Sequence, residues 1–213
     1  MPRDFFARPS VPVAPDLLGC VLEHQTEAGL VAVELTEVEA YAGASDPASH
    51  AYRGKTARNA VMFGPPGHAY VYFTYGMHFC VNLVCLGNGS ASAVLLRAGR
   101  IIAGEELARA RRTHCQAVVP FRDLARGPAR LCQALDIDRS LGGADVCVPD
   151  SPLRMRWPDA STTARSADRK ILSGPRVGIS AAAEVPWRFW FEGEPTVSAY
   201  RPAVPRRRKL VTP

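Results

Sequence analysis

The sequence contains few lysines, no closely paired cysteines and no long apolar run. Lysine and arginine together number 26, but only Lys55, Lys170 and Lys209 are lysines. The six cysteines include no CxxC pair, so a disulfide framework and a cysteine zinc site are both disfavoured, and we expect reduced thiols. No apolar run approaches membrane-spanning length, and the first residues lack the pattern of a signal peptide. We therefore expect a cytoplasmic protein that is not secreted and does not interact with membranes.

Arginine carries nearly all of the positive charge. The net charge is +6 over 213 residues, of which 47% are hydrophobic and 22% charged. This composition allows one sizeable core and is compatible with a polyanionic partner. The planar guanidinium suits phosphate oxygens better than an ammonium group does, although a coding bias toward arginine would give the same composition.

Alternating and β-branched residues predict a sheet. We expect strands in five places and two further strands late in the chain. The predicted strands span residues 17–23, 30–39, 69–75, 78–86, 93–98, 187–191 and 196–199. The segments 69–75 and 78–86 meet at Gly76-Met77 and read as a hairpin.

The remaining segments predict loops and helices. Residues 42–67 are polar and rich in glycine and proline, which indicates a long functional loop with at most a turn of helix. Residues 104–112 and 128–135 read as helices, the second opened by Gly127-Pro128. We expect a mobile loop at 151–168, one domain over 1–200 and a flexible basic tail at 201–213. The predicted fold is α+β, a single mixed domain with a curved, largely antiparallel sheet surrounded by helices.

Two carboxylates end the second predicted strand. Glu37 and Glu39 are two residues apart, so they lie on the same face of the strand. A solvated strand end would also explain them. The long loop that follows favours a catalytic role, because active-site side chains are commonly held where a strand leads into a loop.

Aromatic residues fill the first strand of the predicted hairpin. Tyr70 and Tyr72 share one face, while Phe73 and Tyr75 share the other. Tyr75 lies beside the turn, where a large ring has little to pack against. An exposed aromatic at a hairpin tip is a candidate wedge for separating base pairs, so we expect a protruding hairpin that enters the minor groove of DNA.

Short motifs that follow one another along most of the chain carry a further signal. They are Glu37–Tyr41, Asp46–His50, Arg58-Asn59, Met62-Phe63, Tyr70–Tyr72, Tyr75–Met77, Asn82, Leu95–Ala98, Gly127–Leu135 and Pro175–Ile179. In order and nearly in spacing, these motifs resemble the alkyladenine (3-methyladenine) DNA glycosylase family.

The resemblance implies a monofunctional DNA-repair hydrolase that flips a damaged purine out of duplex DNA and hydrolyses its N-glycosidic bond. In such a mechanism Glu39 activates the attacking water, which Arg97 also holds. The base pocket is implied to contain Tyr41, His50, Tyr72 and Asn82, and Tyr75 to fill the gap in the duplex. DNA contacts are expected from Arg53, Lys55, Arg58, Met62, Met77 and His78.

The expected partner is double-stranded DNA with damaged purines, bound by a monomer without cofactor or metal. The substrates would belong to the class of 3-methyladenine, 7-methylguanine, hypoxanthine and ethenoadenine. The enzyme would initiate base excision repair, associated with the nucleoid if bacterial. His78 and the loop 85–92 depart from some relatives, and residues 151–168 match nothing with an assignable role.

Three other interpretations compete with this one. A metal site could use Glu39, His50 and His68, but no ligand pair shows zinc spacing. A non-enzymatic DNA-binding module would explain the arginines and the hairpin, but it has no use for Glu39 in a pocket. A lyase activity would need an amine, and Lys55, in the expected active-site loop, reads instead as a phosphate contact.

Overall fold

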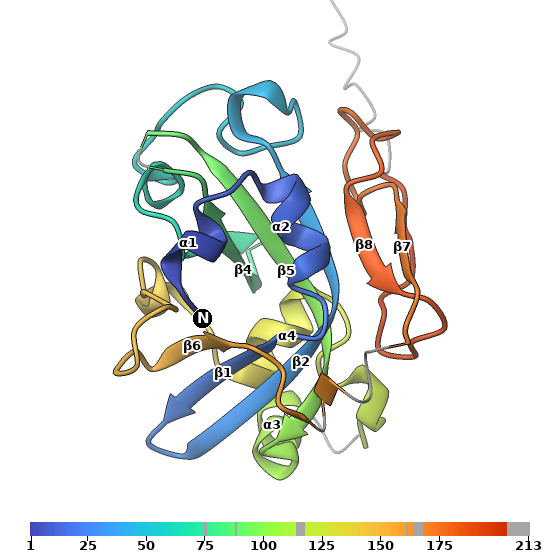
Figure 1. Cartoon of the computed structure of the whole chain (residues 1–213). Helices are drawn as coiled ribbons and strands as arrows, with labels where there is room; N and C mark the ends of the chain where they lie inside the picture. Colours follow the sequence, from blue (N-terminus) through green and yellow to red (C-terminus); the bar gives the residue numbers. More distant parts are fainter. Residues whose placement is uncertain (75, 88, 114–117, 161, 164–167, 204–213) are drawn as a thin grey trace, which may run out of the picture.

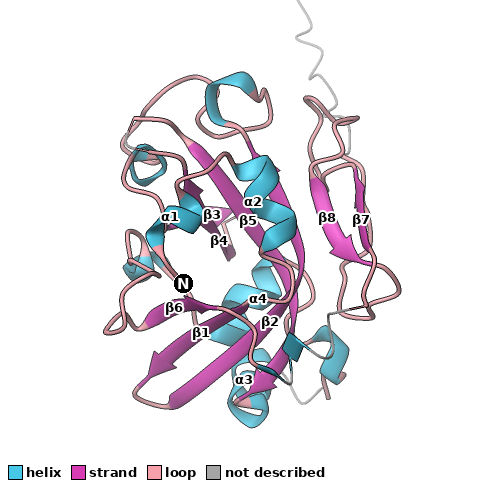
Figure 2. Ribbon diagram, in the orientation of Figure 1, coloured by secondary structure: helices cyan, strands magenta, loops and turns pink. Residues whose placement is uncertain are grey.

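The computed structural model describes residues 1–74, 76–87, 89–113, 118–160, 162–163 and 168–203. Within these residues the strands form one eight-stranded sheet, and each strand pairing is antiparallel. The sheet curls into a half-barrel with helices packed around it (Figures 1 and 2), which confirms the predicted α+β class. The strands are β1 (Val21–Thr26), β2 (Gly29–Tyr41), β3 (Ala69–Thr74), β4 (His78–Cys85), β5 (Ser92–Ala103), β6 (Leu153–Arg156), β7 (Ile171–Gly174) and β8 (Arg188–Phe191). The helices are α1 (Arg3–Phe6), α2 (Ser10–Asp16), α3 (Glu105–Arg112) and α4 (Pro128–Leu135), with short 3-10 helices at Gly43–Ser45, Ala60–Phe63, Phe121–Asp123 and Arg139–Leu141.

Strand β2 lies in the middle of the sheet. The strand order is β3-β4-β5-β2-β1-β6, and β8 also pairs with β2 while β7 pairs with β8. The first half of β2 pairs with β1, and residues 37–39 pair instead with β8. The other edge of β2 pairs with β5. The carboxylate-bearing half of β2 is therefore enclosed by β5 on one side and by the β7–β8 hairpin on the other (Figure 1).

Helices α2 and α4 pack against the sheet and help form its main core. Helix α2 contacts β2 and β5, whereas α4 contacts β4 and β5. The apolar faces of these segments supply fully buried side chains such as Leu17, Leu131 and Leu135. Burying each such side chain contributes about 1.5–3 kcal/mol. This burial holds the central strands rigidly enough to position side chains on them.

The two helices predicted in the middle of the chain are confirmed. Helix α3 follows Gly104, whose φ is +72° and whose place would bring a Cβ within 2.1 Å of the Leu30 carbonyl oxygen, so a larger residue does not fit. Helix α4 begins with Pro128 and ends before Asp136, which adopts the left-handed conformation. Proline in the first turn lacks only a donor that would have no helical partner.

The predicted strand at 17–23 was placed too early. Residues 17–20 follow helix α2, and β1 begins at Val21 and continues to Thr26. Leu17 and Leu18 follow α2 and pack their side chains into the main core, so burial and not pairing in a sheet explains why they are apolar. Apolar runs of this length do not distinguish a buried turn from a strand.

The late part of the chain also differs from expectation. Residues 153–156, inside the segment expected to be a mobile loop, form β6 and pair with β1. Leu153 and Met155 are buried there, alternating with Arg154 and Arg156. Residues 196–199 were expected to form a strand but form none, and β8 pairs instead with β7 and β2. Residues 161, 164–167 and 204–213 lie outside the described part, and the domain bounds stay predictions.

The long loop 42–67 folds over one face of the sheet. As expected it contains little regular structure, with short 3-10 helices at 43–45 and 60–63. Met62 on this loop is buried with Tyr70 and Val84 in a second apolar cluster, separate from the main core. The loop is thereby held beside the aromatic residues of β3.

Candidate active site

One residue from each of four neighbouring strands contributes to a single row across the sheet. Tyr70 of β3 is paired with Asn82 of β4, Asn82 with Leu95 of β5, and Leu95 with Glu39 of β2. Paired residues in neighbouring strands project their side chains to the same face. The register of the sheet therefore brings together residues that are far apart in the sequence.

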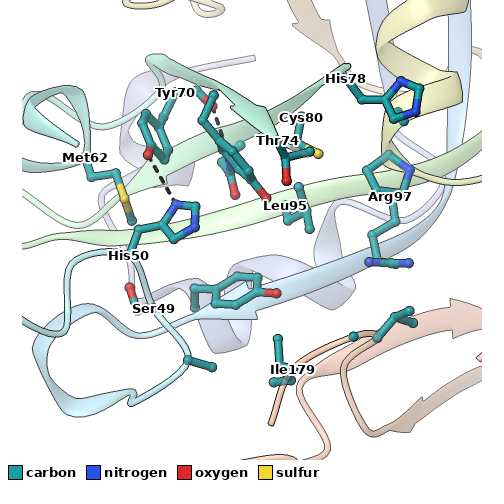
Figure 3. Close-up of a pocket in the computed structure, with 18 residues that line it drawn as sticks. Ser49, His50, Met62, Tyr70, Thr74, His78, Cys80, Leu95, Arg97 and Ile179 are labelled. Atoms are coloured by element: carbon teal, nitrogen blue, oxygen red, sulfur yellow. Dashed lines mark hydrogen bonds between the residues drawn. The ribbon is translucent and has the colours of Figure 1, made fainter. Parts of the chain in front are cut away.

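A cavity of about 410 Å³ opens over this row (Figure 3). Strands β2 to β5 form one side of it, and the loop after β2, the start of α4 and residues 177–179 close it. Its lining is mostly aromatic and apolar with a few polar groups, as in small-molecule sites. The lining residues are Tyr41, Ala48, Ser49, His50, Met62, Tyr70, Tyr72, Thr74, His78, Cys80, Asn82, Leu95, Arg97, Pro128, Ala129, Val177, Gly178 and Ile179.

Three rings lie along one wall of the cavity. Tyr70 and Tyr72 have ring centroids 5.6 Å apart and are stacked, while the His50 ring meets Tyr72 edge-on at 4.6 Å. The Nδ1 atom of His50 lies 3.2 Å from the Tyr70 hydroxyl (Figure 3). Burial and the Arg58 charge lower the pKa of His50, so its ring is neutral at physiological pH. Burial raises the pKa of Tyr72, so this wall carries no charge of its own.

Glu39 is completely buried at the edge of the cavity. Its Oε2 accepts a hydrogen bond from the Tyr41 hydroxyl at 2.8 Å, and its Oε1 accepts one from the Val177 amide at 2.7 Å. Nη1 of Arg97 lies 3.2 Å from the same Oε1. All three partners line the cavity. Burial and the Glu39 charge raise the pKa of Tyr41, which keeps its hydroxyl a donor to the carboxylate.

Arg97 joins Glu39 to the second carboxylate of β2. Its Nε donates to Oε1 of Glu37 at 2.7 Å, and the same oxygen accepts from Nε of Arg188 at 2.7 Å. Burial acts to lower the pKa of Arg97, but the charges of Glu39 and Glu37 outweigh it and raise that pKa. Arg97 is therefore a permanent cation between two carboxylates.

The segment that closes the cavity is fixed by a buried ion pair. Arg176 donates to both carboxylate oxygens of Asp46, at 2.5 and 2.8 Å, and to the Ala40 carbonyl at 3.0 Å. Its guanidinium also lies over the rings of Tyr41, at 4.7 Å, and Trp187, at 5.2 Å. This contact holds residues 176–179 against the end of β2.

The structure gathers the four expected base-pocket residues with Arg97 around one cavity, and Glu39 contacts its lining. Arg53, Lys55 and Arg58 lie exposed on the long loop, and Met77 and His78 are exposed at the hairpin. Met62, expected to contact DNA, is instead only 2% exposed and lines the cavity, since the apolar cluster under the loop takes up its side chain. Tyr75, the expected wedge, lies outside the described residues.

Several site residues were not assigned from the sequence. Val177, Arg176 and the Pro128-Ala129 pair belong to the segments Pro175–Ile179 and Gly127–Leu135, whose resemblance was noted without a role. Arg188 and Ser198 contact Glu37 from segments expected only to be strands. Arg176 and Arg188 could have been recognised as candidates for buried ion pairs because each is an arginine within an otherwise apolar segment.

Among the residues that the structure describes, no group of three or more His, Cys, Asp or Glu side chains is arranged to hold a metal ion. No helix in that part of the chain is long and apolar enough to cross a membrane.

The chain is similar to known proteins over nearly its whole length. A family model described as methylpurine-DNA glycosylase (MPG) matches residues 4–195. Relatives whose names include "3-methyladenine DNA glycosylase" come from several organisms. The protein from Streptomyces avermitilis is 57% identical over 97% of this chain and 94% of its own length. The protein from Leifsonia xyli subsp. xyli is 50% identical over 93% of this chain and 92% of its own length. The protein from Methanocella arvoryzae is 45% identical over 95% of this chain and 97% of its own length. The chain belongs to the methylpurine-DNA glycosylase family.

Proposed function

We propose that this DNA glycosylase flips an alkylated or deaminated purine out of duplex DNA and hydrolyses its N-glycosidic bond with a water activated by Glu39. The observation that carries the proposal is a buried carboxylate whose three partners line a cavity walled by aromatic rings. The product would be an intact abasic site, the starting point of base excision repair.

The cavity suits a flat base. The rings of Tyr41, Tyr72 and His50 offer faces and edges for stacking, and cationic bases stack well on electron-rich rings. Asn82 is 5% exposed, and its amide donates to the Tyr70 carbonyl at 3.2 Å, so its orientation is fixed where it can meet the edge of a base. The proposed substrates are 3-methyladenine, 7-methylguanine, hypoxanthine and ethenoadenine.

Glu39 and Arg97 support hydrolysis by water. Each carboxylate oxygen has two acceptor sites, so Oε2 of Glu39 can accept a proton from water while it keeps its bond from Tyr41. The anion also favours the positive charge that develops on the sugar as the bond breaks. Arg97 holds the carboxylate in place from the cavity wall and can hold the same water.

The positions of the lysines support a monofunctional enzyme. A glycosylase that also cuts the strand normally attacks with an amine. Neither Lys55 nor Lys170 lines the cavity, and Lys170 lies 3.5 Å from Glu192 on the surface. Lys209 lies outside the described residues.

Replacing Glu39 with Gln tests the catalytic assignment. The amide keeps the size of the side chain but removes the base and its charge, so we expect lesion DNA to bind within about twofold of wild type while excision falls by about 100-fold or more. The measurement is single-turnover base release with a chelator present, together with a binding titration on the same duplex. Near wild-type excision by Glu39→Gln would remove Glu39 from the mechanism, and restoration of activity by a divalent ion would indicate a metal-dependent reaction.

A further inference from the structure

Glu37 is a buried carboxylate that the proposed reaction does not use. It is 0% exposed and does not line the cavity. Oε1 accepts hydrogen bonds from Nε of Arg97, Nε of Arg188 and Oγ of Ser198, and Oε2 accepts one from the Ser198 amide, all between 2.7 and 2.9 Å. Burial acts to raise the pKa of Glu37, but the charges of Arg97 and Arg188 and the Ser198 amide outweigh it and lower that pKa. Glu37 is therefore a fixed anion.

The contacts of Arg97 divide its donors between two carboxylates. Nε is committed to Glu37, Nη2 donates to Oγ of Ser198 at 3.2 Å, and Nη1 reaches Glu39. Arginine–carboxylate pairs frequently form two parallel hydrogen bonds. Such pairing with Glu39 would occupy the acceptor sites that a water needs. Glu37 opposes it by accepting from Nε directly and by fixing Oγ of Ser198, which accepts from Nη2.

The charges around Glu37 balance. Glu37 and Glu39 supply two negative charges, and Arg97 and Arg188 supply two positive charges, so this buried group is neutral. Arg188 is fixed further by its contact over the Trp190 ring at 4.6 Å and by donation to the Ser198 carbonyl at 2.7 Å. Without Glu37, two arginines would share one carboxylate, and Arg97 would be drawn toward Glu39.

We propose that Glu37 is a positioning residue, which anchors Arg97 so that Arg97 contacts Glu39 through one nitrogen and leaves the Glu39 carboxylate able to accept a proton from water. This inference rests on the proposed function of Glu39. Glu37 itself touches neither the base nor the water and takes no part in any bond change.

The test compares Glu37→Gln with a matched variant, Glu194→Gln. Glu194 is also a buried carboxylate held by two arginines, Arg100 at 2.6 Å and Arg169 at 3.1 Å, but it does not line the cavity or contact Arg97. Single-turnover excision and the Kd for a 3-methyladenine or hypoxanthine duplex are measured for both variants, with the melting temperature of each. We expect Glu37→Gln to lower the excision rate about 10- to 100-fold with Kd within twofold of wild type. Glu194→Gln should lose a similar amount of stability and keep its rate.

A second variant covers the case in which Glu37→Gln does not fold. Glu37→Asp keeps the negative charge but shortens the side chain by one methylene, so Nε of Arg97 is no longer held, and excision should again fall while binding persists. A wild-type rate in either folded variant, or equal rate losses in the Glu37 and Glu194 variants, would overturn the positioning role. If wild type excises the base, Glu39→Gln does not, and Glu37→Gln keeps the wild-type rate, this inference is refuted while the proposed function stands. Absence of base release by wild type would refute the proposed function and this inference with it.

Discussion

At the scale of single residues, the buried pair of Asp46 and Arg176 connects three parts of the site. Arg176 precedes Val177, whose amide donates to Glu39, and it lies over the ring of Tyr41. Asp46 belongs to the loop that carries His50. Both side chains of the pair are 0% exposed, so neither charge can be solvated if the other is removed.

We expect Asp46→Ala to cost about 3–5 kcal/mol of unfolding free energy, because it leaves the Arg176 charge buried without its partner. Urea unfolding of wild type and variant measures this loss. The matched control is Asp16→Ala, which breaks the exposed ion pair with Arg8 and should cost less than about 1 kcal/mol. Equal losses in the two variants would mean that the buried pair does not fix the loop.

Residue spacing predicted part of the site and could not predict the rest. Alternation on the strands placed Glu37 with Glu39 and Tyr70 with Tyr72, whereas the roles of Tyr41 and Asn82 could be assigned only through the resemblance to the family. The donors that fix the two carboxylates lie far along the chain. Arg188 is 151 residues from Glu37, and Val177 is 138 residues from Glu39. No local pattern encodes such a pairing, since it depends on the strand order of the folded sheet.

At the scale of elements, the turn end of the β3–β4 hairpin exposes residues beside the cavity. Met77 is 69% exposed beside the turn, and His78 both lines the cavity and is exposed. This placement suits a hairpin that contacts DNA while the cavity receives a base. The role of Tyr75 stays a prediction from the sequence.

We expect Tyr75→Ala to lose more activity on a stably paired lesion than on the same lesion opposite a mismatch. A ring that replaces the flipped nucleotide offsets an unpairing cost of a few kcal/mol, and this cost is smaller at a mismatch. Single-turnover excision on the two duplexes measures the difference, with a thermal melt as control. Equal losses together with a lowered melting temperature would assign Tyr75 to the fold.

The elements themselves were predictable where local signals were strong. Helix α4 was recognised from Gly127-Pro128, and the β3–β4 hairpin from two β-rich runs around a turn. Strand β6 was missed because four residues with two buried side chains resemble a loop until β1 is placed beside them. Strand β7 was missed for the same reason. It pairs with β8, and β8 is positioned by its own pairing with β2.

At the scale of the whole molecule, buried carboxylates link stability to pH. Glu37 and Glu194 both have lowered pKa values, because paired arginines and backbone amides outweigh the burial that acts to raise them. In the unfolded chain a glutamate titrates at about 4.3. A group with a lowered pKa in the folded state contributes stability above its unfolded pKa and loses that contribution as the pH falls through its folded pKa.

We therefore expect the unfolding free energy of wild type to decrease as the pH falls below about 4.3. Glu37→Gln should show a shallower decrease over the same range, because the variant has one carboxylate fewer to protonate. Urea denaturation at a series of pH values between 3 and 7 measures both curves. Parallel curves would mean that Glu37 does not titrate differently in the folded and unfolded states.

The enclosure of β2 by β8 also bears on how the protein is made. A ribosome releases the chain from its N-terminus, so β2 emerges long before Arg188 and Ser198, the residues that hold Glu37. Until those residues are translated, residues 37–39 of β2 lack their partners in β8, and Glu37 lacks the hydrogen bonds from Arg188 and Ser198. The hydrogen bonds that hold Glu37 in the folded protein can therefore form completely only after residue 198 has been translated.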